Sequence, residues 1–240
     1  MAENLILFTY NFPHKKSLKG MQLVKSHGFK NVSVIASPKV KLNFRQSKNR
    51  INVAEQEIIN PSTLSKHYGW KTLIAHHNSE EAISFYKELK PAFGLIFGAR
   101  ILSKNVIDSF SKGIINFHPG VLPENRGLDN LKWAIYNSLP QGVTTHLIDE
   151  NIDVGKQIYK DFINLDLDDT IFDVNSKLFD LQMIHLDKLL KENFVIKDLE
   201  SLKSKYKSQK PVSDNIDNEI INNFENYKKN YSKILELYIK

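Results

Sequence analysis

The sequence contains no cysteine among its 240 residues. Disulfide bridges, thiolate metal sites and cysteine nucleophiles are therefore excluded. No stretch reaches the roughly 18 consecutive apolar residues that a membrane helix needs. The first ten residues also lack the basic segment that opens a signal peptide. We therefore expect a cytoplasmic chain that does not insert into a membrane.

Arginine is scarce, and the chain holds only Arg45, Arg50, Arg100 and Arg126. Bidentate recognition by guanidinium groups is limited to these few places. The formal net charge of +6 is uneven, because residues 1–50 hold ten Lys or Arg and a single acid, Glu3. A basic first fifth is able to attract phosphates or a nucleic acid. The alternative, a solvated lysine-rich face, is the more usual outcome for a run of charges.

Short apolar runs alternate with segments of helical spacing over residues 5–117. Strands are expected at 5–10, 32–36, 72–75, 93–97 and 113–117, and helices at 16–27, 61–68, 78–89 and 103–110. This alternation predicts βαβ units and an α/β fold with a doubly wound, mostly parallel, Rossmann-like sheet. Ligands bind such sheets at the carboxyl ends of the strands. That rule selects the segments after Tyr10, Ala75, Phe97 and Phe117.

The chain changes character after about residue 190. A β-prone run at 193–196 precedes a polar, lysine-rich stretch, and residues 216–240 have helical spacing. A tail of about fifty residues is too small to bury a core of its own. We predict a catalytic domain at 1–190 and a helix-and-hairpin appendage at 191–240. The appendage is expected to pack on the first domain or on another subunit.

The residues that carry chemistry lie between 97 and 158. Asn116 and His118 are two residues apart at a predicted strand end, so their side chains project to the same side. Phe117 faces the other way, and Pro119 ends the strand. An amide is able to donate to a developing oxyanion, and an imidazole moves protons near neutral pH. Asp153, in a later turn, is suited to orient the imidazole, bind a water or stabilise the imidazolium.

Each of these residues has an ordinary structural explanation when taken alone. A single histidine such as His118 is more often a satisfied structural residue. A single aspartate such as Asp153 is more often a turn residue that accepts from its own backbone. The ordered set changes this balance, and it consists of Asn116-Phe117-His118-Pro119, Arg126-Gly127 and the stretch His146–Gly155. No Ser, Thr or Lys in the set is an obvious nucleophile, which favours direct transfer to a bound acceptor.

This ordered set resembles the folate-dependent formyltransferase family. The resemblance is specific over residues 93–160 and extends at the level of the fold over residues 1–190. It implies N10-formyltetrahydrofolate as the co-substrate, without a metal. It also implies that Asn116, His118 and Asp153 form a catalytic trio.

The same resemblance implies two walls of a folate site. One wall is the backbone of the segment formed by Arg100, Ile101 and Leu102, which is similar to the segment that holds the pterin ring in the family. The other wall is the loop that begins at Asp149 and ends at Asp153. These roles come from the resemblance alone.

Departures from the family narrow the expected acceptor. The segment 10–16 has no glycine, which disfavours the tight phosphate cradle of glycinamide ribonucleotide formyltransferases. Methionyl-tRNA formyltransferases carry a further C-terminal barrel domain, and formyltetrahydrofolate hydrolases carry an extra domain ahead of the catalytic one. We expect neither domain here. The remaining group N-formylates nucleotide-linked amino sugars.

Within that group, the sequence most resembles bacterial enzymes that act on dTDP-4-amino-4,6-dideoxyglucose in O-antigen and lipopolysaccharide synthesis. A homodimer through the C-terminal appendage is implied. His14 and Lys15, next to Lys16 in the basic segment after the first strand, are expected to bind the substrate's pyrophosphate, although a solvated loop is an equal alternative. Arg126 is the third expected substrate-binding residue.

Two other functions stay open on the sequence. A methionyl-tRNA formyltransferase with a shortened tail is supported by the basic N-terminal region. A catalytically silent folate-binding protein is the second, but binding alone does not require Asn, His and Asp together. We expect neither a nucleic-acid partner nor a metal. His76 and His77 are too isolated from other ligand types for zinc and are expected at the surface.

Overall fold

The structure is a computed structural model, and it describes residues 4–40, 59–151, 153–197, 199–202 and 206–240. Arg45 and Arg50, part of the basic first fifth, lie outside these residues. The described strands are β1 (Leu5–Tyr10), β2 (Val32–Ser37), β3 (Lys71–Leu73), β4 (Phe93–Ile96), β5 (Gly113–His118), β6 (Gly142–Leu147), β7 (Gly155–Phe162) and β8 (Glu200–Leu202). The described helices are α1 (Lys15–Ser26), α2 (Pro61–His67), α3 (Glu80–Leu89), α4 (Lys104–Ile107), α5 (Asn130–Tyr136), α6 (Ile171–Lys191) and α7 (Asp214–Ile239).

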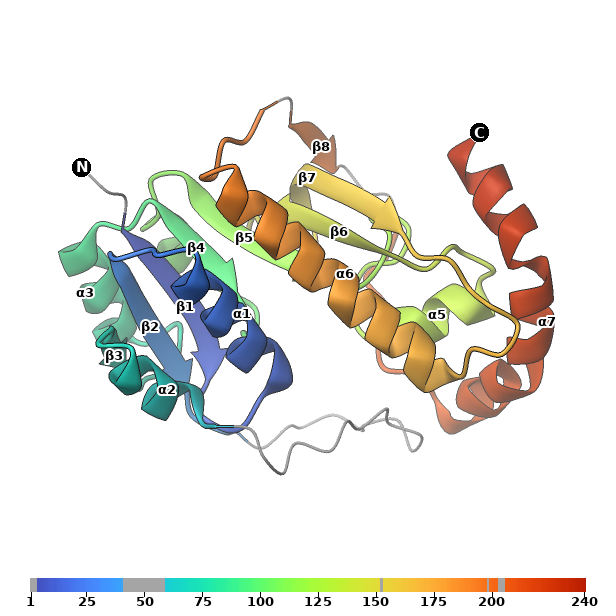
Figure 1. Cartoon of the computed structure of the whole chain (residues 1–240), viewed down its shortest axis with the longest axis horizontal. Helices are drawn as coiled ribbons and strands as arrows, with labels where there is room; N and C mark the ends of the chain where they lie inside the picture. The colour runs from blue at the N-terminus through green and yellow to red at the C-terminus, as the bar shows by residue number, and fades with distance from the viewer. Residues whose placement is uncertain (1–3, 41–58, 152, 198, 203–205) are drawn as a thin grey trace.

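All of these strands join one sheet, in the order β3-β2-β1-β4-β5-β6-β7-β8 (Figure 1). Pairing is parallel from β3 to β5 and antiparallel from β5 to β8. The predicted α/β fold with a mostly parallel sheet is confirmed, and the antiparallel part was not predicted. The chain leaves β1 towards β3 and returns to β4 on the other side of β1. The switch point therefore lies between β1 and β4, where such sheets bind ligands.

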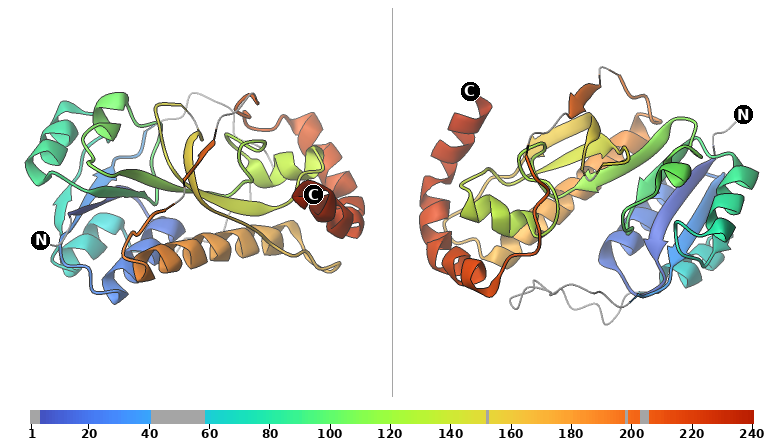
Figure 2. Two further views of the ribbon diagram at one scale, coloured as in Figure 1. Left: turned by 90° about the horizontal axis from the view of Figure 1, so that it is seen from above. Right: turned by 180° about the vertical axis from the view of Figure 1, so that it is seen from behind.

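Helices cover both faces of the parallel half (Figure 2). The helices α1, α2 and α6 pack on one face, and α3 and α4 pack on the other. In β1, Leu5 and Leu7 enter the first core while Ile6 and Phe8 enter the second, and all four are buried. A strand that is covered on both faces reads as a continuous apolar run, which is the pattern that predicted it. None of the described helices is long and apolar enough to cross a membrane.

The third helix begins at Glu80, two residues later than the sequence suggests. Ser79 is the N-cap of α3, and its hydroxyl accepts from the Ala82 amide at 3.2 Å. Asn78 has a different task, because its side chain donates to the Ile101 carbonyl and accepts from the Ser103 amide, both at 2.9 Å. The expected helix start at Asn78 was wrong, since this side chain braces the segment that follows β4.

The β-prone run at 193–196 is not a strand. Asn193 and Phe194 have positive φ angles of 49° and 57°, a conformation that does not continue a β-ladder. The Phe194 ring instead stacks on Phe93 with centroids 4.9 Å apart. The strand of the tail is β8, which pairs with β7 and extends the main sheet instead of forming a separate hairpin.

Helix α7 shares a core with α5 and α6. This core contains Leu131, Ile135, Val143, Val174, Leu178, Ile220, Phe224, Tyr227 and Tyr231. A buried ion pair joins α5 to α7, with the Lys132 ammonium 2.5 Å from the Asp217 carboxylate. The C-terminal tail therefore packs on the rest of the chain, which was one of the two expected arrangements, the other being packing on another subunit. A boundary at residue 190 stays a prediction, because the segment after it shares both the sheet and a core.

His77 follows β3 and is buried, while its neighbour His76 is exposed. The expectation of two surface histidines was therefore wrong for His77. Its Nε2 donates to the Thr9 carbonyl oxygen at 3.0 Å, and the ring meets Phe8 edge-on. Burial lowers the pKa of His77 from its usual 6.5 to about 4, because the charged ring loses its water.

We predict that His77→Gln weakens the acid sensitivity of folding. Between about pH 6.5 and pH 4 the unfolded chain binds a proton at His77 that the folded chain does not, so stability falls as the pH falls. Urea unfolding at several pH values in this window measures the slope, which is expected to flatten by up to one proton in His77→Gln. The matched control is His76→Gln. Equal flattening in both variants would show that burial of His77 is not the cause.

Candidate active site

Strand β5 presents two polar side chains at its carboxyl end. Asn116 and His118 alternate with Phe117, which is fully buried in the core beneath α1 and α6. The two polar residues therefore face the opposite side of the sheet from Phe117. The predicted placement of the Asn-Phe-His motif at a strand end agrees with the structure.

The His118 imidazole lies between two acceptors. Its Nδ1 is 3.3 Å from the Asp153 carboxylate, and its Nε2 donates to the Asn125 carbonyl oxygen at 2.8 Å. Its side chain is only 4% exposed. A neutral imidazole has one N–H, so only the doubly protonated ring donates to both acceptors. A ring that carries a proton on each nitrogen would therefore donate to Asp153 and to Asn125 together.

Asp153 is held in place by its own backbone and by a distant loop. It adopts the left-handed conformation, with φ of 49°, and its second carboxylate oxygen accepts from the Gly127 amide at 2.8 Å. Gly127 has φ of 99°, and a Cβ there would lie 2.3 Å from the Gln209 carbonyl oxygen. The glycine of the Arg-Gly pair therefore has a physical reason, since a larger residue does not fit at the point where the Gly127 amide contacts Asp153.

Two buried amides shape the loop that reaches His118. The Asn125 side chain donates to the Asn130 carbonyl at 2.8 Å, and the Asn130 side chain donates back to the Asn125 carbonyl at 3.0 Å. The Asn125 carbonyl is the same oxygen that receives His118 Nε2. Neither residue was predicted from the sequence. Nothing in their spacing indicates that each amide would cap the other's backbone.

His146 stands directly across the antiparallel ladder from Asn116. Its Nδ1 donates to the Val154 carbonyl at 3.0 Å, which leaves Nε2 as an acceptor 3.4 Å from the Asn116 amide nitrogen. Complete burial, together with the nearby His118, lowers the pKa of His146 to about 4. A neutral His146 therefore orients the Asn116 amide. The motif included this residue, but the sequence assigned it no role.

The predicted pterin segment follows β4. Arg100 and Ile101 are exposed, and Leu102 is buried. Asn78 holds the backbone on both sides of Leu102 through the Ile101 carbonyl and the Ser103 amide. Contacts between this segment and a folate stay a prediction. A braced backbone with an exposed Ile101 side chain suits that role.

The second predicted wall is a tight turn. Asp149 accepts from the Asn151 amide at 2.7 Å, so its carboxylate closes an Asx turn. Gly155 ends the segment with φ of 109°, and a Cβ there would lie 2.0 Å from the Leu147 carbonyl oxygen. The turn thus fixes the path of the chain on both sides of Asp153. The contact of Asp149 with a folate stays a prediction.

The loop after β1 joins the site from the other side of the switch point. The Tyr10 hydroxyl donates to the Ala99 carbonyl at 2.9 Å, which ties this loop to the segment after β4. Phe12 stacks on Tyr10, with ring centroids 4.9 Å apart. His14 is hydrogen-bonded through Nδ1 to the Ser17 hydroxyl at 2.9 Å. Burial, then the neighbouring lysine at 16, lowers the pKa of His14 to about 4, so this ring is neutral.

The three predicted substrate-binding residues are not gathered in one place. His14 is the N-cap of α1, and the Lys15 ammonium lies 4.3 Å from the centre of the Phe179 ring on α6. Arg126 donates to the Tyr206 carbonyl at 2.9 Å and so contacts the C-terminal segment. Their roles in binding stay predictions. Lys16, which was not among the three, is the basic residue of this turn that reaches β5.

Comparison with known proteins identifies the family. Residues 9–189 match the model of the family described as formyl transferase. This chain belongs to the formyl transferase family. In the parts of the chain that the structure describes, no group of three or more His, Asp or Glu is placed to hold a metal ion.

Curated relatives of the chain match over part of their length. The chain is 34% identical over 105 residues to a methionyl-tRNA formyltransferase of Clostridium tetani, which is 43% of this chain and 34% of that protein. It is 41% identical over 91 residues to the methionyl-tRNA formyltransferase of Clostridium beijerinckii, which is 37% of this chain and 29% of that protein. The chain therefore spans about a third of the length of these curated relatives.

Solved structures share the fold at low sequence identity. A likely sugar N-formyltransferase from Mycobacterium tuberculosis has a TM-score of 0.61 at 18% identity, covering 86% of this chain and 75% of that one. An N-formyltransferase from Helicobacter canadensis, in complex with folinic acid and dTDP-3-aminofucose, has a TM-score of 0.61 at 20% identity, covering 88% and 72%. Phosphoribosylglycinamide formyltransferase from Streptococcus pneumoniae has a TM-score of 0.60 at 16% identity, covering 80% and 99%. These likenesses show the fold.

We predict that His146 stays neutral, with its proton on Nδ1, down to about pH 5, because its pKa is about 4. Two-bond ¹H–¹⁵N correlation spectra across a pH titration report the tautomer and the charge of the ring. Asn116→Asp provides the comparison, since a carboxylate beside Nε2 favours the charged ring and raises this pKa. A wild-type ring that titrates at its usual 6.5, or that carries its proton on Nε2, would contradict the assignment.

Proposed function

We propose that this chain transfers a formyl group from N10-formyltetrahydrofolate to the amine of a nucleotide-linked amino sugar. The carrying observation is the arrangement of Asn116, His118 and Asp153 at the carboxyl end of β5, in a member of the formyl transferase family. The acceptor we expect is dTDP-4-amino-4,6-dideoxyglucose, used in O-antigen synthesis. The likeness in fold to sugar N-formyltransferases supports this choice.

The reaction begins when the unprotonated acceptor amine attacks the formyl carbon. A carbon–nitrogen bond forms, and the carbonyl π electrons move onto oxygen. Asn116 has one amide hydrogen directed to His146, which leaves the other for the developing oxyanion. His118, when both ring nitrogens are protonated, stabilises the same oxyanion through space. Both His118 N–H groups face protein acceptors in the absence of substrate, so a direct bond to the oxyanion requires one of these contacts to be shared.

The attacking nitrogen must then lose a proton. Asp153 is the carboxylate beside the site, and it accepts this proton directly or through a water. The oxyanion electrons re-form the carbonyl as the bond between the formyl carbon and N10 breaks, and the proton taken by Asp153 is passed to N10 to give tetrahydrofolate. The products are the N-formylated sugar and tetrahydrofolate. Holding donor and acceptor together in one crevice removes much of the entropic barrier.

We predict that Asn116→Ala and Asp153→Ala each lower kcat by roughly a hundredfold or more, because the first removes a preorganised oxyanion donor and the second removes the proton acceptor. Steady-state kinetics with the best acceptor measures the effect, and circular dichroism verifies the fold of each variant. The control is Asp180→Asn, an exposed carboxylate on α6 outside the predicted site, which is expected to keep kcat. A folded Asn116→Ala or Asp153→Ala enzyme with near-normal kcat would refute the assignment.

Methionyl-tRNA formylation is the second candidate function. Its specific support is the sequence identity of 34% and 41% to clostridial methionyl-tRNA formyltransferases over their aligned parts. The basic first fifth of the chain is compatible with a polyanionic acceptor. A folate-binding protein without catalytic activity is the third candidate.

A formylation panel separates these candidates. Purified protein is incubated with N10-formyltetrahydrofolate and with dTDP- or UDP-linked amino sugars, methionyl-tRNA or glycinamide ribonucleotide, and products are read by mass spectrometry. Replacement of H by CHO on a nucleotide sugar is the expected result. Formylation of methionyl-tRNA alone would move the conclusion to the second candidate. Folate binding without any formylated acceptor would favour the third.

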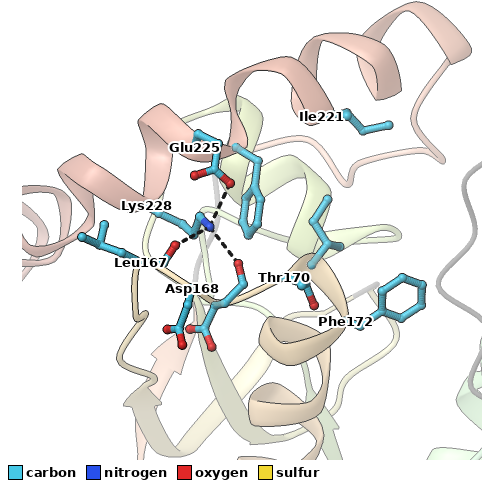
Figure 3. Close-up of a pocket in the computed structure, with 10 residues that line it drawn as sticks. Leu167, Asp168, Thr170, Phe172, Ile221, Glu225 and Lys228 are labelled. Carbon is cyan, nitrogen blue, oxygen red and sulfur yellow. Dashed lines mark hydrogen bonds and ion pairs between the residues drawn. The ribbon is translucent and has the colours of Figure 1, made fainter.

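We further propose that the chain forms a homodimer through its C-terminal segment. A shallow groove of about 650 Å³ lies between the β7–α6 connection and α7 (Figure 3). Exposed apolar side chains of Leu167, Phe172 and Ile221 lie along it. Lys228 closes its floor by donating to the Leu167 and Asp169 carbonyls at 2.7 and 2.9 Å. None of the predicted site residues lines this groove, so dimerisation there leaves the active site open.

A substitution in the groove tests the dimer. Phe172→Glu places a charge on the apolar surface and is expected to convert the dimer to a monomer, as measured by sedimentation velocity. The matched control is Ile184→Glu, because Ile184 is equally exposed but lies outside the groove. A monomeric wild-type protein, or a dimer that survives Phe172→Glu, would contradict the proposal.

A further inference from the structure

Lys16 connects the first helix to the catalytic strand. It lies in the first turn of α1, and its ammonium donates to the Phe117 carbonyl oxygen at 2.8 Å. Phe117 lies between Asn116 and His118, so this hydrogen bond fixes the backbone between the two predicted catalytic residues. This contact spans the switch point from the loop after β1 to the end of β5.

The Lys16 ammonium has no counter-ion in the described part of the chain. Its contacts there are the Phe117 carbonyl and the Phe117 ring, whose centre is 5.8 Å away. Burial of the ammonium lowers the pKa of Lys16 to about 7, with no offsetting carboxylate among the described residues. The side chain is partly buried, and a charge withdrawn from water is normally paired, because leaving it unpaired is costly. An ammonium with no counter-ion among the described residues, at the switch point where such sheets bind ligands, is therefore a ready partner for an anion.

The surroundings of Lys16 add to its positive character. No acidic residue lies in the first turn of α1, and the N-cap His14 makes no side-chain hydrogen bond to the helix backbone. The N-terminus of the twelve-residue helix α1, which is the positive end of its dipole, therefore lies beside Lys16. The preceding residue, Lys15, makes a cation–π contact with the Phe179 ring of α6. Of the two lysines, Lys16 is the one that approaches the catalytic strand.

We propose that Lys16 determines acceptor specificity by binding a phosphate of the acceptor's diphosphate. An ammonium has three N–H donors, and the bond to the Phe117 carbonyl uses one of them. The remaining donors bind the phosphate, which supplies the missing counter-charge. The same ammonium contacts the backbone between Asn116 and His118. It therefore holds the bound diphosphate at a fixed position relative to β5. This proposal rests on the proposed function for the nature of the acceptor, but phosphate binding is testable without catalysis.

The first arm measures kinetics with Lys16→Met, Lys16→Gln and Lys19→Met. Lys19 is exposed on the same helix and is the control. In Lys16→Met we expect KM for the nucleotide sugar to rise by about tenfold or more, because a charge-assisted contact is lost. We expect kcat and KM for the formyl donor to change by less than about threefold. Lys16→Gln, whose amide still donates to the Phe117 carbonyl, keeps the test valid if Lys16→Met does not fold.

A fall in kcat at unchanged KM would overturn the phosphate assignment, since it would make Lys16 a positioning residue for the strand alone. Unchanged kinetics in both Lys16 variants would overturn it as well. A rise in KM that Lys19→Met reproduces would indicate a diffuse effect of net charge and would also reject the site.

The second arm measures binding by calorimetry, with dTDP and with inorganic pyrophosphate as probes. Wild type and Lys19→Met are expected to bind both, and Lys16→Gln to bind each about tenfold more weakly. Equal affinity of all three proteins would sink the proposal. If pyrophosphate binds through Lys16 while the panel gives no formylated nucleotide sugar, the proposed function fails and the anion site stands. Phosphate-dependent binding of methionyl-tRNA alone would reject the diphosphate as the occupant.

Discussion

The contact between the His118 imidazole and the Asp153 carboxylate is the interaction on which the site depends. It joins β5 to a turn that is far away in the sequence, and the Gly127 amide completes it from a third segment. Because the Asn125 carbonyl holds the other ring nitrogen, the imidazole is fixed at both ends. Networks of this kind are strong when every member is satisfied and costly when one is missing. The strained turn at Asp153 and the glycine at 127 are consistent with that demand.

The change from parallel to antiparallel pairing at β5 produces the rest of the constellation. In the parallel half, the carboxyl ends of β1, β4 and β5 meet at the switch point, where such sheets bind ligands. In the antiparallel half, the register sets His146 opposite Asn116. A buried, neutral imidazole accepts from the Asn116 amide without adding a charge beside it. Strand β5 is thus positioned by its parallel pairing with β4, and the Asn116 amide is oriented by His146 on β6.

Charge is distributed unevenly around this crevice. His14 is neutral because it is buried, and the Lys15 ammonium contacts an aromatic ring. Lys16 is directed at β5, with no counter-ion among the residues that the structure describes. Three adjacent basic residues therefore have three different electrostatic states. In the sequence they form one basic segment, and they differ only in how deeply each side chain is buried and in what it contacts. The functional weight of such a segment depends on the side chain that reaches the ligand crevice.

The sequence by itself determined the α/β fold, most helix and strand positions and the family, because apolar periodicity and the ordered motif are local properties. It also placed Asn116 and His118 on one side of a strand, since a strand alternates its faces. The tertiary structure decided what lies between segments: the antiparallel pairing of β6 with β5, the loop amides around His118 and the direction of Lys16. It also moved the tail strand from 193–196 to β8 and buried His77. Those outcomes depend on packing between residues far apart in the chain, and no local pattern encodes which surface each side chain meets.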